Sequence, residues 1–314
     1  MSEYLSIVVP VYNEVDNLKL LNNKIKEVLE PQKISYEIIY VDDGSKDNSY
    51  KILQELAQTD DSVKVIKFKR NFGQTAAMAA GFDYAQGEII VPLDADLQND
   101  PQDIPAMIKK YKEGYDIVSG WRKDRKDNII KKIPSQIANK LISNLTGTHL
   151  HDYGCTLKVY NSKLLKNVKL YGEMHRFIPA LAAIEGATIT EMPVNHNPRI
   201  RGKSKYNLSR TPNVVLDLLT IVFLENFRTK PMHFFGKLAL AVFALIITSL
   251  FGLLLNILAP IVVVDYSLVT ILGTLLIIFG LQLICIGIVA EMIMRCYYGA
   301  NDKKIYCVEK NYKD

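Results

Sequence analysis

Two long stretches without a charged side chain, both in the last quarter of the chain, constrain the fold more than any other feature. No charged residue occurs in 238–264, and after Asp265 none occurs in 266–290. Each stretch exceeds the roughly 20 apolar residues that a helix needs to cross a bilayer. Buried core helices are the alternative, but core helices of this length normally carry a polar face. We therefore predict a hairpin of two membrane-spanning helices.

The basic residues around the hairpin predict its orientation. The connection holds only Asp265, whereas basic residues flank both outer ends: Arg228, Lys230 and Lys237 before the hairpin, and Arg295, Lys303 and Lys304 after it. By the positive-inside rule, both flanks face the cytoplasm and the turn faces outward. The first residues run past Glu3 directly into a strand pattern and do not resemble a cleavable signal. We expect a multi-pass protein of the cytoplasmic membrane with both termini in the cytoplasm.

The charge pattern indicates a membrane partner. The formal net charge is +5, and the basic residues gather in 121–132, in 199–205 and beside the hairpin. None of these runs forms a basic helix with interleaved aromatic residues, so we expect no nucleic acid partner. Anionic lipid headgroups are the expected surface. The four cysteines, Cys155, Cys285, Cys296 and Cys307, lack paired metal-ligand spacing and are interpreted as reduced thiols.

Before the hairpin, strand patterns alternate with helical patterns. The strand patterns cover 5–11, 36–41, 63–68, 88–93, 115–119 and 188–194, and the helical patterns cover 18–29, 49–57, 75–85, 100–112 and 129–146. This alternation predicts an α/β domain with a mostly parallel sheet covered by helices. In 212–235, apolar residues recur at helical spacing among charged ones. This favours an amphipathic helix along the membrane surface, although packing against the soluble core would give the same pattern.

Polar side chains collect where the first four strand patterns end. They are Asn13 and Glu14, then Asp42, Asp43, Gly44 and Ser45, then Arg70, Asn71 and Gly73, and finally Asp94, Asp96 and Gln98. Any one of these groups alone would be an ordinary loop. Parallel strands bring their carboxyl ends to one edge, where ligands of open α/β sheets bind. The four groups together therefore predict a ligand site.

The sharpest element of this set is Asp94-Ala95-Asp96. Residues two apart in an extended chain point to the same side, so both carboxylates can face one ligand. Carboxylate oxygens suit a hard divalent cation, Mg²⁺ or Mn²⁺, that also binds a diphosphate. The alternative is an Asx-rich turn after a strand, and Pro92 is awkward inside a central strand. The apolar run that leads into the motif favours the metal and diphosphate site.

Six stretches carry a resemblance to a known family. They read SIVVPVYNE, YVDDGSKDNS, RNFGQTAAMAAGFDYAQGEIIVPLDADLQNDP, SGWRKDR, DYGCTLKVY and RIRGKSKY. Together they resemble the family 2 glycosyltransferases with the GT-A fold, in the branch of polyprenyl-phosphate glycosyltransferases. That branch includes bacterial undecaprenyl-phosphate glucosyltransferases and dolichol-phosphate mannose synthase-like enzymes. The resemblance covers 4–210 and implies a nucleotide sugar donor, a polyprenyl phosphate acceptor and a metal, Mg²⁺ or Mn²⁺.

The resemblance also implies roles for single residues. It assigns the nucleoside to Pro10, Tyr12, Glu14, Asp42 and Asp94, and the metal and diphosphate to Asp94, Asp96 and Gln98. Arg122 matches an arginine that meets phosphate, and Asp152 matches an acidic residue near the acceptor. We expect Asp152 to orient sugar or acceptor, with a general base or a structural loop residue as the alternatives.

A second group of residues is implied on the lipid-phosphate side. Arg199, Ser204 and Lys205 match the R-x-x-G-x-S-K element of the family, and Arg201 is an additional phosphate candidate. His175 resembles part of an acceptor-side helix, with a simple surface residue as the equal alternative. These groups would lie close to the lipid headgroups.

The resemblance predicts transfer of a single sugar with inversion, because the chain lacks the Q-x-x-R-W element of processive synthases. We expect glucose from UDP-glucose and undecaprenyl phosphate as the substrates, with GDP-mannose, UDP-N-acetylglucosamine or a modified arabinose donor as alternatives. A catalytically silent sugar-nucleotide sensor or membrane scaffold is the alternative of another class. The expected parts are a GT-A domain at 1–210, an amphipathic segment at 211–236, the hairpin at 237–295 and a cytoplasmic tail at 296–314. The oligomeric state stays open, a homo-oligomer included.

Overall fold

The computed structural model describes residues 4–123, 142–143, 147–198, 231–258, 266–300 and 304–312, and single positions within 216–227. The chain divides into two compact units. The first contains Met1–Leu218 together with Lys304–Asp314, and the second contains Leu219–Lys303. The expected helices at 129–146 and 212–235 lie largely outside the described residues, so they stay predictions.

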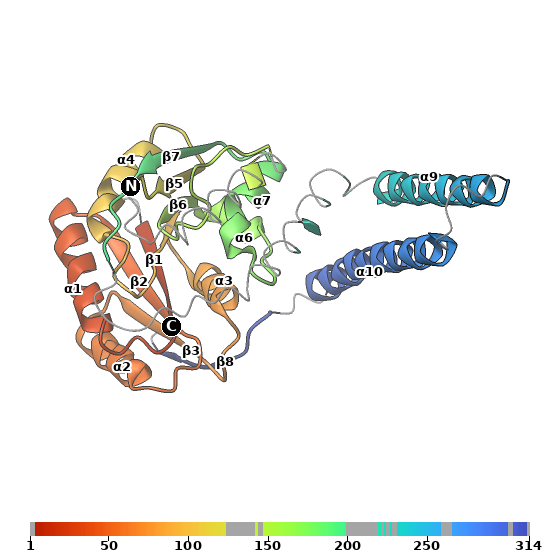
Figure 1. Ribbon diagram of the computed structural model, residues 1–314. Helices are drawn as coiled ribbons and strands as arrows, with labels where there is room; N and C mark the ends of the chain where they lie inside the picture. The colour runs from red at the N-terminus through yellow and green to blue at the C-terminus, as the bar shows by residue number, and fades with distance from the viewer. Residues whose placement is uncertain are drawn as a thin grey trace. The chain divides into compact units, whose positions relative to one another are not determined.

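The first unit is built on one eight-stranded sheet in the order β7-β5-β6-β4-β1-β2-β3-β8 (Figure 1). The strands are β1 (Tyr4–Val11), β2 (Ser35–Asp42), β3 (Val63–Phe68), β4 (Ile89–Pro92), β5 (Ile117–Trp121), β6 (Lys158–Asn161), β7 (Ile189–Pro193) and β8 (Val308–Tyr312). The six strands that the sequence predicts are confirmed. β6 and β8 are strands that it did not predict.

Helices and short 3-10 turns connect these strands. They are α1 (Leu18–Leu29), η1 (Glu30–Gln32), α2 (Ser49–Thr59), α3 (Gln74–Tyr84), η2 (Pro101–Asp103), α4 (Ile104–Tyr111), α6 (Ser162–Asn167), η3 (Met174–Phe177) and α7 (Ile178–Ile184). The apolar faces of α1, α2 and α4 join one buried cluster with Ile7, Val9 and Tyr40. This cluster is the main hydrophobic core, and burial of its side chains drives the folding of the unit.

The opposite face of the sheet is covered by α3. A side chain at Gly81 would come within 2.2 Å of the Val8 side chain, so only glycine permits this approach of helix to strand. The close packing fixes α3 against the middle of the sheet. Its first turn consequently lies at the carboxyl ends of the strands, beside Asp94.

The prediction of a mostly parallel sheet holds for four of the seven described strand pairs, and the other three pairs are antiparallel. Among the described strands, β1 pairs in parallel with β2 and β4, β2 with β3, and β5 with β7, whereas β6 and β8 form antiparallel pairs. The sheet is therefore mixed. Pro92 is tolerated because it pairs with Val8 at the end of β4, beyond the two residues of β4 that pair with β6.

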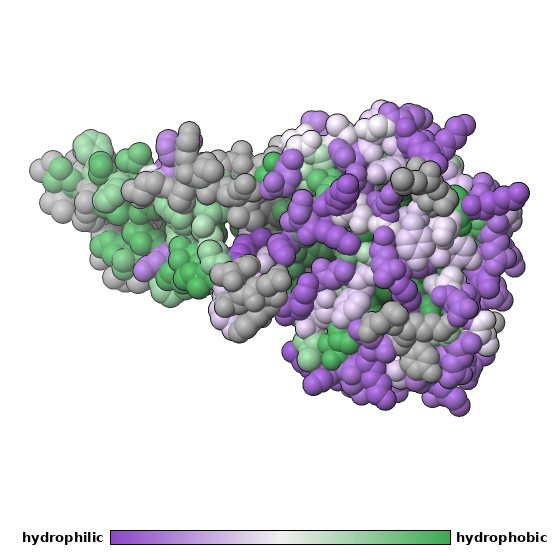
Figure 2. Space-filling model, turned by 180° about the vertical axis from the view of Figure 1, so that it is seen from behind, coloured by the Kyte–Doolittle hydropathy of each residue, from purple (hydrophilic) through white to green (hydrophobic). Residues whose placement is uncertain are grey.

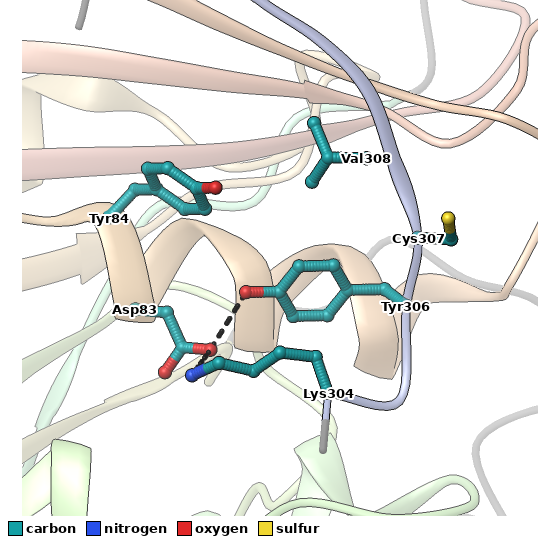
Figure 3. A pocket seen from close by; sticks show the side chains of 6 residues that line it. All are labelled: Asp83, Tyr84, Lys304, Tyr306, Cys307 and Val308. Carbon is teal, nitrogen blue, oxygen red and sulfur yellow. Dashed lines mark hydrogen bonds and ion pairs between the residues drawn. The ribbon is translucent and has the colours of Figure 1, made fainter. Parts of the chain in front are cut away.

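Strand β8 returns the chain to the first unit after the hydrophobic segments. It pairs antiparallel with β3, and Tyr306 stacks on Phe68 with ring centroids 5.2 Å apart. Its flank is fixed to α3, because Lys304 Nζ and Tyr306 Oη both lie within hydrogen-bonding distance of Asp83 Oδ2, at 2.9 Å and 2.8 Å (Figure 3). Together with Tyr84, Cys307 and Val308, these side chains line a pocket of about 400 Å³.

The described helices of the second unit are α9 (Pro231–Leu258) and α10 (Tyr266–Ala300), and their surface is strongly hydrophobic (Figure 2). Exposed side chains on these helices include Leu240 at 69% and Leu276 at 71%. Within the described residues, Gly273–Tyr298 is the one segment whose length and mean hydropathy of 2.4 would let it cross a membrane. In α9, which covers most of the other expected span, His233–Thr248 is a shorter apolar helix. One of the two expected spans is thus supported, and the other stays a prediction.

Candidate active site

The loops after β1 and β2 are joined at the carboxyl edge of the sheet. The Asn13 amide donates to Ser45 Oγ at 3.0 Å, and the Lys46 amide donates back to Asn13 Oδ1 at 2.8 Å. Glu14 is held through its amide, which donates to Ser49 Oγ, and through its carboxylate, which accepts from Asn17 Nδ2 at 2.8 Å. These contacts fix the surroundings of the predicted nucleoside residues Pro10, Tyr12 and Glu14, which are all partly exposed.

Asp42 ends β2 with a fully buried side chain. Its Oδ1 atom accepts from the Ser45 amide at 3.3 Å, whereas its Oδ2 atom has no hydrogen-bond partner among the described residues. Burial raises the pKa of this carboxyl, although the hydrogen bonds from Ser45 oppose the rise. A buried acceptor without a partner is costly, so it is suited to a donor supplied by a ligand. The nucleoside role of Asp42 stays a prediction.

Asp43 has a different partner from its neighbour. Its two carboxylate oxygens accept from the amides of Phe72 at 2.6 Å and Gly73 at 2.9 Å, directly before α3. Burial raises the pKa of Asp43 to about 6, while these two amides act in the opposite direction. Asp43 therefore fixes the loop that starts α3, a structural role that the motif alone did not reveal.

Asp94 is held from two sides. Gln74 Nε2, at the start of α3, donates to its Oδ1 atom at 2.9 Å, and Thr156 Oγ1 donates to its Oδ2 atom at 2.7 Å. Burial and the nearby charge of Asp96 raise its pKa to about 6, with the Thr156 hydrogen bond and Arg122 acting against the rise. The two carboxylates repel each other when both are ionised. A cation that binds between them is therefore favoured.

The residues present fit a divalent cation. Asp96 Oδ1 accepts from the Gln98 amide at 3.1 Å, and Leu97 between them takes a φ of 61°, so the chain turns sharply after Asp96. No group of three or more His, Cys, Asp or Glu side chains suited to a metal exists in the described part of the chain. Mg²⁺ is commonly bound by one or two carboxylates plus substrate phosphates, so a pair is sufficient.

Arg122 follows β5 and forms a bidentate ion pair with Asp152. Arg122 Nε and Nη2 donate to the two carboxylate oxygens at 2.6 Å and 2.9 Å, and the Gly154 amide donates to Asp152 Oδ1 at 3.0 Å. Burial disfavours the guanidinium charge, but the hydrogen bond and charge of Asp152 outweigh it and raise the pKa of Arg122. Both side chains are largely buried, with exposures of 13% and 6%. The arginine is permanently charged and rigidly oriented.

A match to a family model identifies the family of this chain. The model described as Glycosyl transferase family 2 matches residues 6–169, which is just over half of the 314 residues. The chain belongs to glycosyl transferase family 2. The matched residues contain Asp42, Asp94, Asp96, Arg122 and Asp152, and so include most of the site described above.

Relatives of this glycosyltransferase extend over almost the whole chain. The dodecaprenyl-phosphate galacturonate synthase of Rhizobium johnstonii is 41% identical in an alignment 315 positions long, which covers 99% of this chain and 93% of the relative. The undecaprenyl-phosphate 4-deoxy-4-formamido-L-arabinose transferase of Edwardsiella ictaluri is 34% identical, over 98% of this chain and 94% of the relative. Similarity therefore continues through the hydrophobic helices.

Solved structures support the fold. Mannosyl-3-phosphoglycerate synthase from Rubrobacter xylanophilus matches with a TM-score of 0.56 and 16% identity, over 73% of this chain and 76% of that one. Glucosyl-3-phosphoglycerate synthase from Mycobacterium tuberculosis, crystallised with Mn²⁺ and UDP-glucose, matches with a TM-score of 0.52 and 14% identity, over 71% and 79%. At such low identity these structures show the fold alone, and they support the GT-A type.

His175 does not lie on the surface of the glycosyltransferase. It is buried on η3, and its Nδ1 atom is 2.7 Å from Thr75 Oγ1 on the first turn of α3. This atom is thereby engaged within the fold, next to Gln74, which binds Asp94. The geometry suits a residue that supports α3 better than one that receives a lipid phosphate. Arg199, Arg201, Ser204 and Lys205 lie outside the described residues, and their roles stay predictions.

The sequence missed several residues that shape the site. Gln74 and Thr156 bind Asp94, and both lie inside stretches that carry the family resemblance, so the motifs contained the signal without the role. Lys158 on β6 is buried, and its Nζ atom donates to the backbone oxygens of Tyr153 and Cys155. Burial lowers the pKa of Lys158. The lysine braces the turn that supplies both Asp152 and Thr156.

Proposed function

We propose that this protein transfers a single sugar from a nucleoside diphosphate to the phosphate of a polyprenyl phosphate. The observation that carries the proposal is the cluster of Asp94, Asp96 and the Arg122–Asp152 pair at one edge of the sheet. Relatives named for dodecaprenyl and undecaprenyl phosphate, at 41% and 34% identity over almost the full chain, support the acceptor.

The donor that we propose is not glucose. The names of the two relatives give galacturonate and a formamido-substituted arabinose, which supports the modified arabinose alternative better than UDP-glucose. Galacturonate carries a carboxylate in place of the hydroxymethyl group of glucose, and arabinose lacks that carbon. A donor without the hydroxymethyl group is what these sugars share. We therefore propose a UDP-linked galacturonate or modified arabinose.

The site residues divide the reaction between them. Asp42 and the loop around Glu14 would bind the nucleoside, and Asp94 and Asp96, with Gln98 beside them, would hold Mg²⁺ or Mn²⁺. The metal would neutralise charge on the departing diphosphate. Arg122 would bind a phosphate oxygen, because a fixed guanidinium stabilises charge that develops in the transition state.

The nucleophile requires little help from a base. A phosphate monoester has a second pKa near ~6 and is already ionised at neutral pH. Asp152 is a weak candidate for such a base, because its ion pair with Arg122 stabilises the ionised carboxylate. We propose that Asp152 orients Arg122. The acceptor oxygen would attack opposite the nucleotide, with inversion at the anomeric carbon.

We also propose that both hydrophobic stretches cross the cytoplasmic membrane, with the catalytic unit and both termini on the cytoplasmic side. Polyprenyl chains leave a bilayer only at a cost of about 0.8 kcal/mol per methylene group, so the reaction has to occur at the headgroup plane. The exposed apolar surface of α10 supports this anchoring.

The test uses the full-length protein in membranes with undecaprenyl phosphate, Mg²⁺ and labelled sugars. UDP-galacturonate, a UDP-linked formamido-arabinose and UDP-glucose are compared by the label that enters organic solvent. We expect one of the first two donors to be preferred. Preferential use of UDP-glucose would refute the donor proposal, and absence of lipid product from every donor would refute the transfer.

Asp96→Ala is the matched site variant. We expect it to lower turnover by about a hundredfold or more, because a charge-stabilising interaction of the transition state is lost. Its thermal unfolding should equal that of the wild-type protein, since Asp96 is partly exposed. Near-normal turnover with intact metal dependence would show that the metal site lies elsewhere.

A further inference from the structure

Two neighbouring contacts join the end of β5 to the loop before β6. Arg122 pairs with Asp152, and the residues directly before them, Trp121 and His151, stack with ring centroids 4.3 Å apart and an interplanar angle of 20°. The two contacts form successive rungs between the same two segments. Any displacement of His151 therefore moves Asp152 as well, because the two share one peptide bond.

Strand β7 holds His151 in its stack with Trp121. Glu191 Oε2 on β7 accepts from the His151 amide at 2.9 Å, and Glu191 Oε1 contacts His151 Nδ1. β5 and β7 pair in parallel, with Ser119 opposite Glu191. Side chains two residues apart point to the same face, so Glu191 and Trp121 lie on the same side of the sheet and enclose His151.

Glu191, His151 and Trp121 form what we call the clamp. It is unusual because it is exposed to solvent. The His151 side chain is 64% exposed and Glu191 is 19% exposed, whereas Arg122 and Asp152 below them are largely buried. Exposed ion pairs contribute little to folding stability. Glu191 nevertheless contacts the exposed His151 with both of its carboxylate oxygens. These two contacts therefore point to a role in fixing geometry.

We propose that Glu191, His151 and Trp121 are positioning residues for the Arg122–Asp152 pair, a role that rests on the proposed phosphate contact of Arg122. Glu191 fixes both the backbone and the ring of His151 against Trp121. The fixed backbone at 151 sets the place of the Asp152 carboxylate, and the carboxylate sets the plane of the Arg122 guanidinium. In this proposal the clamp acts only through the Arg122–Asp152 pair.

The primary test is turnover of Glu191→Ala with undecaprenyl phosphate and whichever labelled donor the donor comparison selects. We expect turnover to fall about ten- to a hundredfold, the scale produced by misplacing a catalytic group by about 1 Å. Glu191→Gln should recover most of it, because its amide oxygen still accepts from the His151 amide. The midpoint of thermal unfolding should stay within about 2 °C of the wild-type value, because the His151 partner of Glu191 is exposed.

Asp116→Ala is the matched control. Asp116 accepts from the Thr188 amide at 2.9 Å and from Thr188 Oγ1 at 2.8 Å, so it clamps the same pair of strands at the other end. We expect this variant to keep wild-type turnover. An equal loss in Asp116→Ala and Glu191→Ala would show a general effect of the β5–β7 pair and would overturn the proposal.

A double-mutant cycle separates positioning from simple destabilisation. Arg122→Lys removes the planar fork that the clamp orients, so Glu191→Ala should lower turnover far less in that background than in the wild-type protein. Equal losses in the two backgrounds, or turnover of Glu191→Ala within twofold of wild type, would overturn the clamp. If Arg122→Lys itself keeps full turnover, the assigned phosphate contact fails instead.

Trp121 supplies a signal that does not depend on activity, because it is the one tryptophan of the chain. Its fluorescence reports the stack with His151 directly. We expect the emission to change in Glu191→Ala and in His151→Ala and to stay unchanged in Asp116→Ala. Unchanged emission in Glu191→Ala would show that the carboxylate does not hold the stack and would overturn the proposal even if turnover fell.

Discussion

Asp42 and Asp43 are adjacent in the sequence and equally acidic, yet the fold gives them separate tasks. Asp42 keeps one buried oxygen without a partner among the described residues, whereas Asp43 uses both oxygens on the amides before α3. The motif YVDDGS predicted a polar strand end but could not distinguish the role of Asp42 from that of Asp43. The division depends on where Phe72 and Gly73 lie, and that is set by the packing of α3 against the sheet.

The pKa of Asp43 gives a prediction for stability against pH. Burial raises it from an ordinary 3.8 to about 6, so between these values the folded protein binds more protons than the unfolded chain. The contribution of Asp43 to stability is complete below about pH 4 and is lost as pH rises through about 6. We expect wild type to lose roughly 3 kcal/mol relative to Asp43→Asn across this window.

Denaturant unfolding of the metal-free, detergent-solubilised protein, followed by Trp121 fluorescence, measures at pH 4.5 and pH 7 the part of this loss that falls between them, about 2 kcal/mol. The Asp43→Asn variant cancels every other titrating group, because all of them are present in both proteins. A stability difference that is independent of pH would show that the Asp43 carboxyl titrates normally in the folded state.

At the scale of secondary structure, the strongly apolar strands could be predicted, and two strands rich in polar residues could not. β1, β2 and β4 are largely continuous runs of buried residues, which is typical of strands covered on both faces. β6 reads Lys-Val-Tyr-Asn and β8 reads Val-Glu-Lys-Asn-Tyr, and in both the polar residues hide the apolar pattern of a strand. Charged residues are common on edge strands, where they prevent pairing with other chains.

Strand β8 gives a prediction for its own element. Tyr306→Ala removes both the ring stacked on Phe68 and the hydrogen bond to Asp83, so we expect a loss of about 2 kcal/mol in local stability. Amide hydrogen exchange should increase in Val308–Tyr312 and along β3. Tyr306→Phe is the control, because it keeps the stack and loses only the hydroxyl, and it should cost about 1 kcal/mol.

The two variants also test whether β8 is a separate unit of folding. Exchange that increases in β8 and β3 alone would show that the strand opens locally while the sheet stays intact. Exchange that increases equally in β1 and β2 would contradict this, because the whole sheet would then open together.

At the scale of the whole molecule, the sequence predicted a cytoplasmic tail at 296–314. In the structure, Lys304–Asp314 belongs to the same compact unit as Met1–Leu218, and the hydrophobic helices form an insertion between them. Hydropathy identifies such an insertion, but it carries no information on where the chain returns. The return depends on pairing between β8 and β3. These strands are far apart in the sequence, so a local sequence pattern cannot reveal that they pair.

The insertion predicts a topology for the protein in a sealed membrane. Basic residues flank both ends of the hairpin, so the turn at Asp265 should face outward and the catalytic unit should face the cytoplasm. We expect an impermeant thiol reagent to label Asp265→Cys in intact right-side-out vesicles. The native Cys307, which is exposed in the catalytic unit, should react only after the vesicles are permeabilised.

Two features of the chain make this experiment decisive. Cys155 is buried, so replacing Cys285 and Cys296 by serine leaves Cys307 as the one accessible native thiol of the described residues. Each vesicle sample then carries one reporter on each predicted side, and their order of labelling gives the orientation without reference to activity. Because two crossings return the chain to the side from which it left, the two reporters have to differ if the hairpin spans. Labelling of both thiols only after permeabilisation would show that the first hydrophobic stretch does not cross the membrane and that the pair of helices lies on the cytoplasmic face.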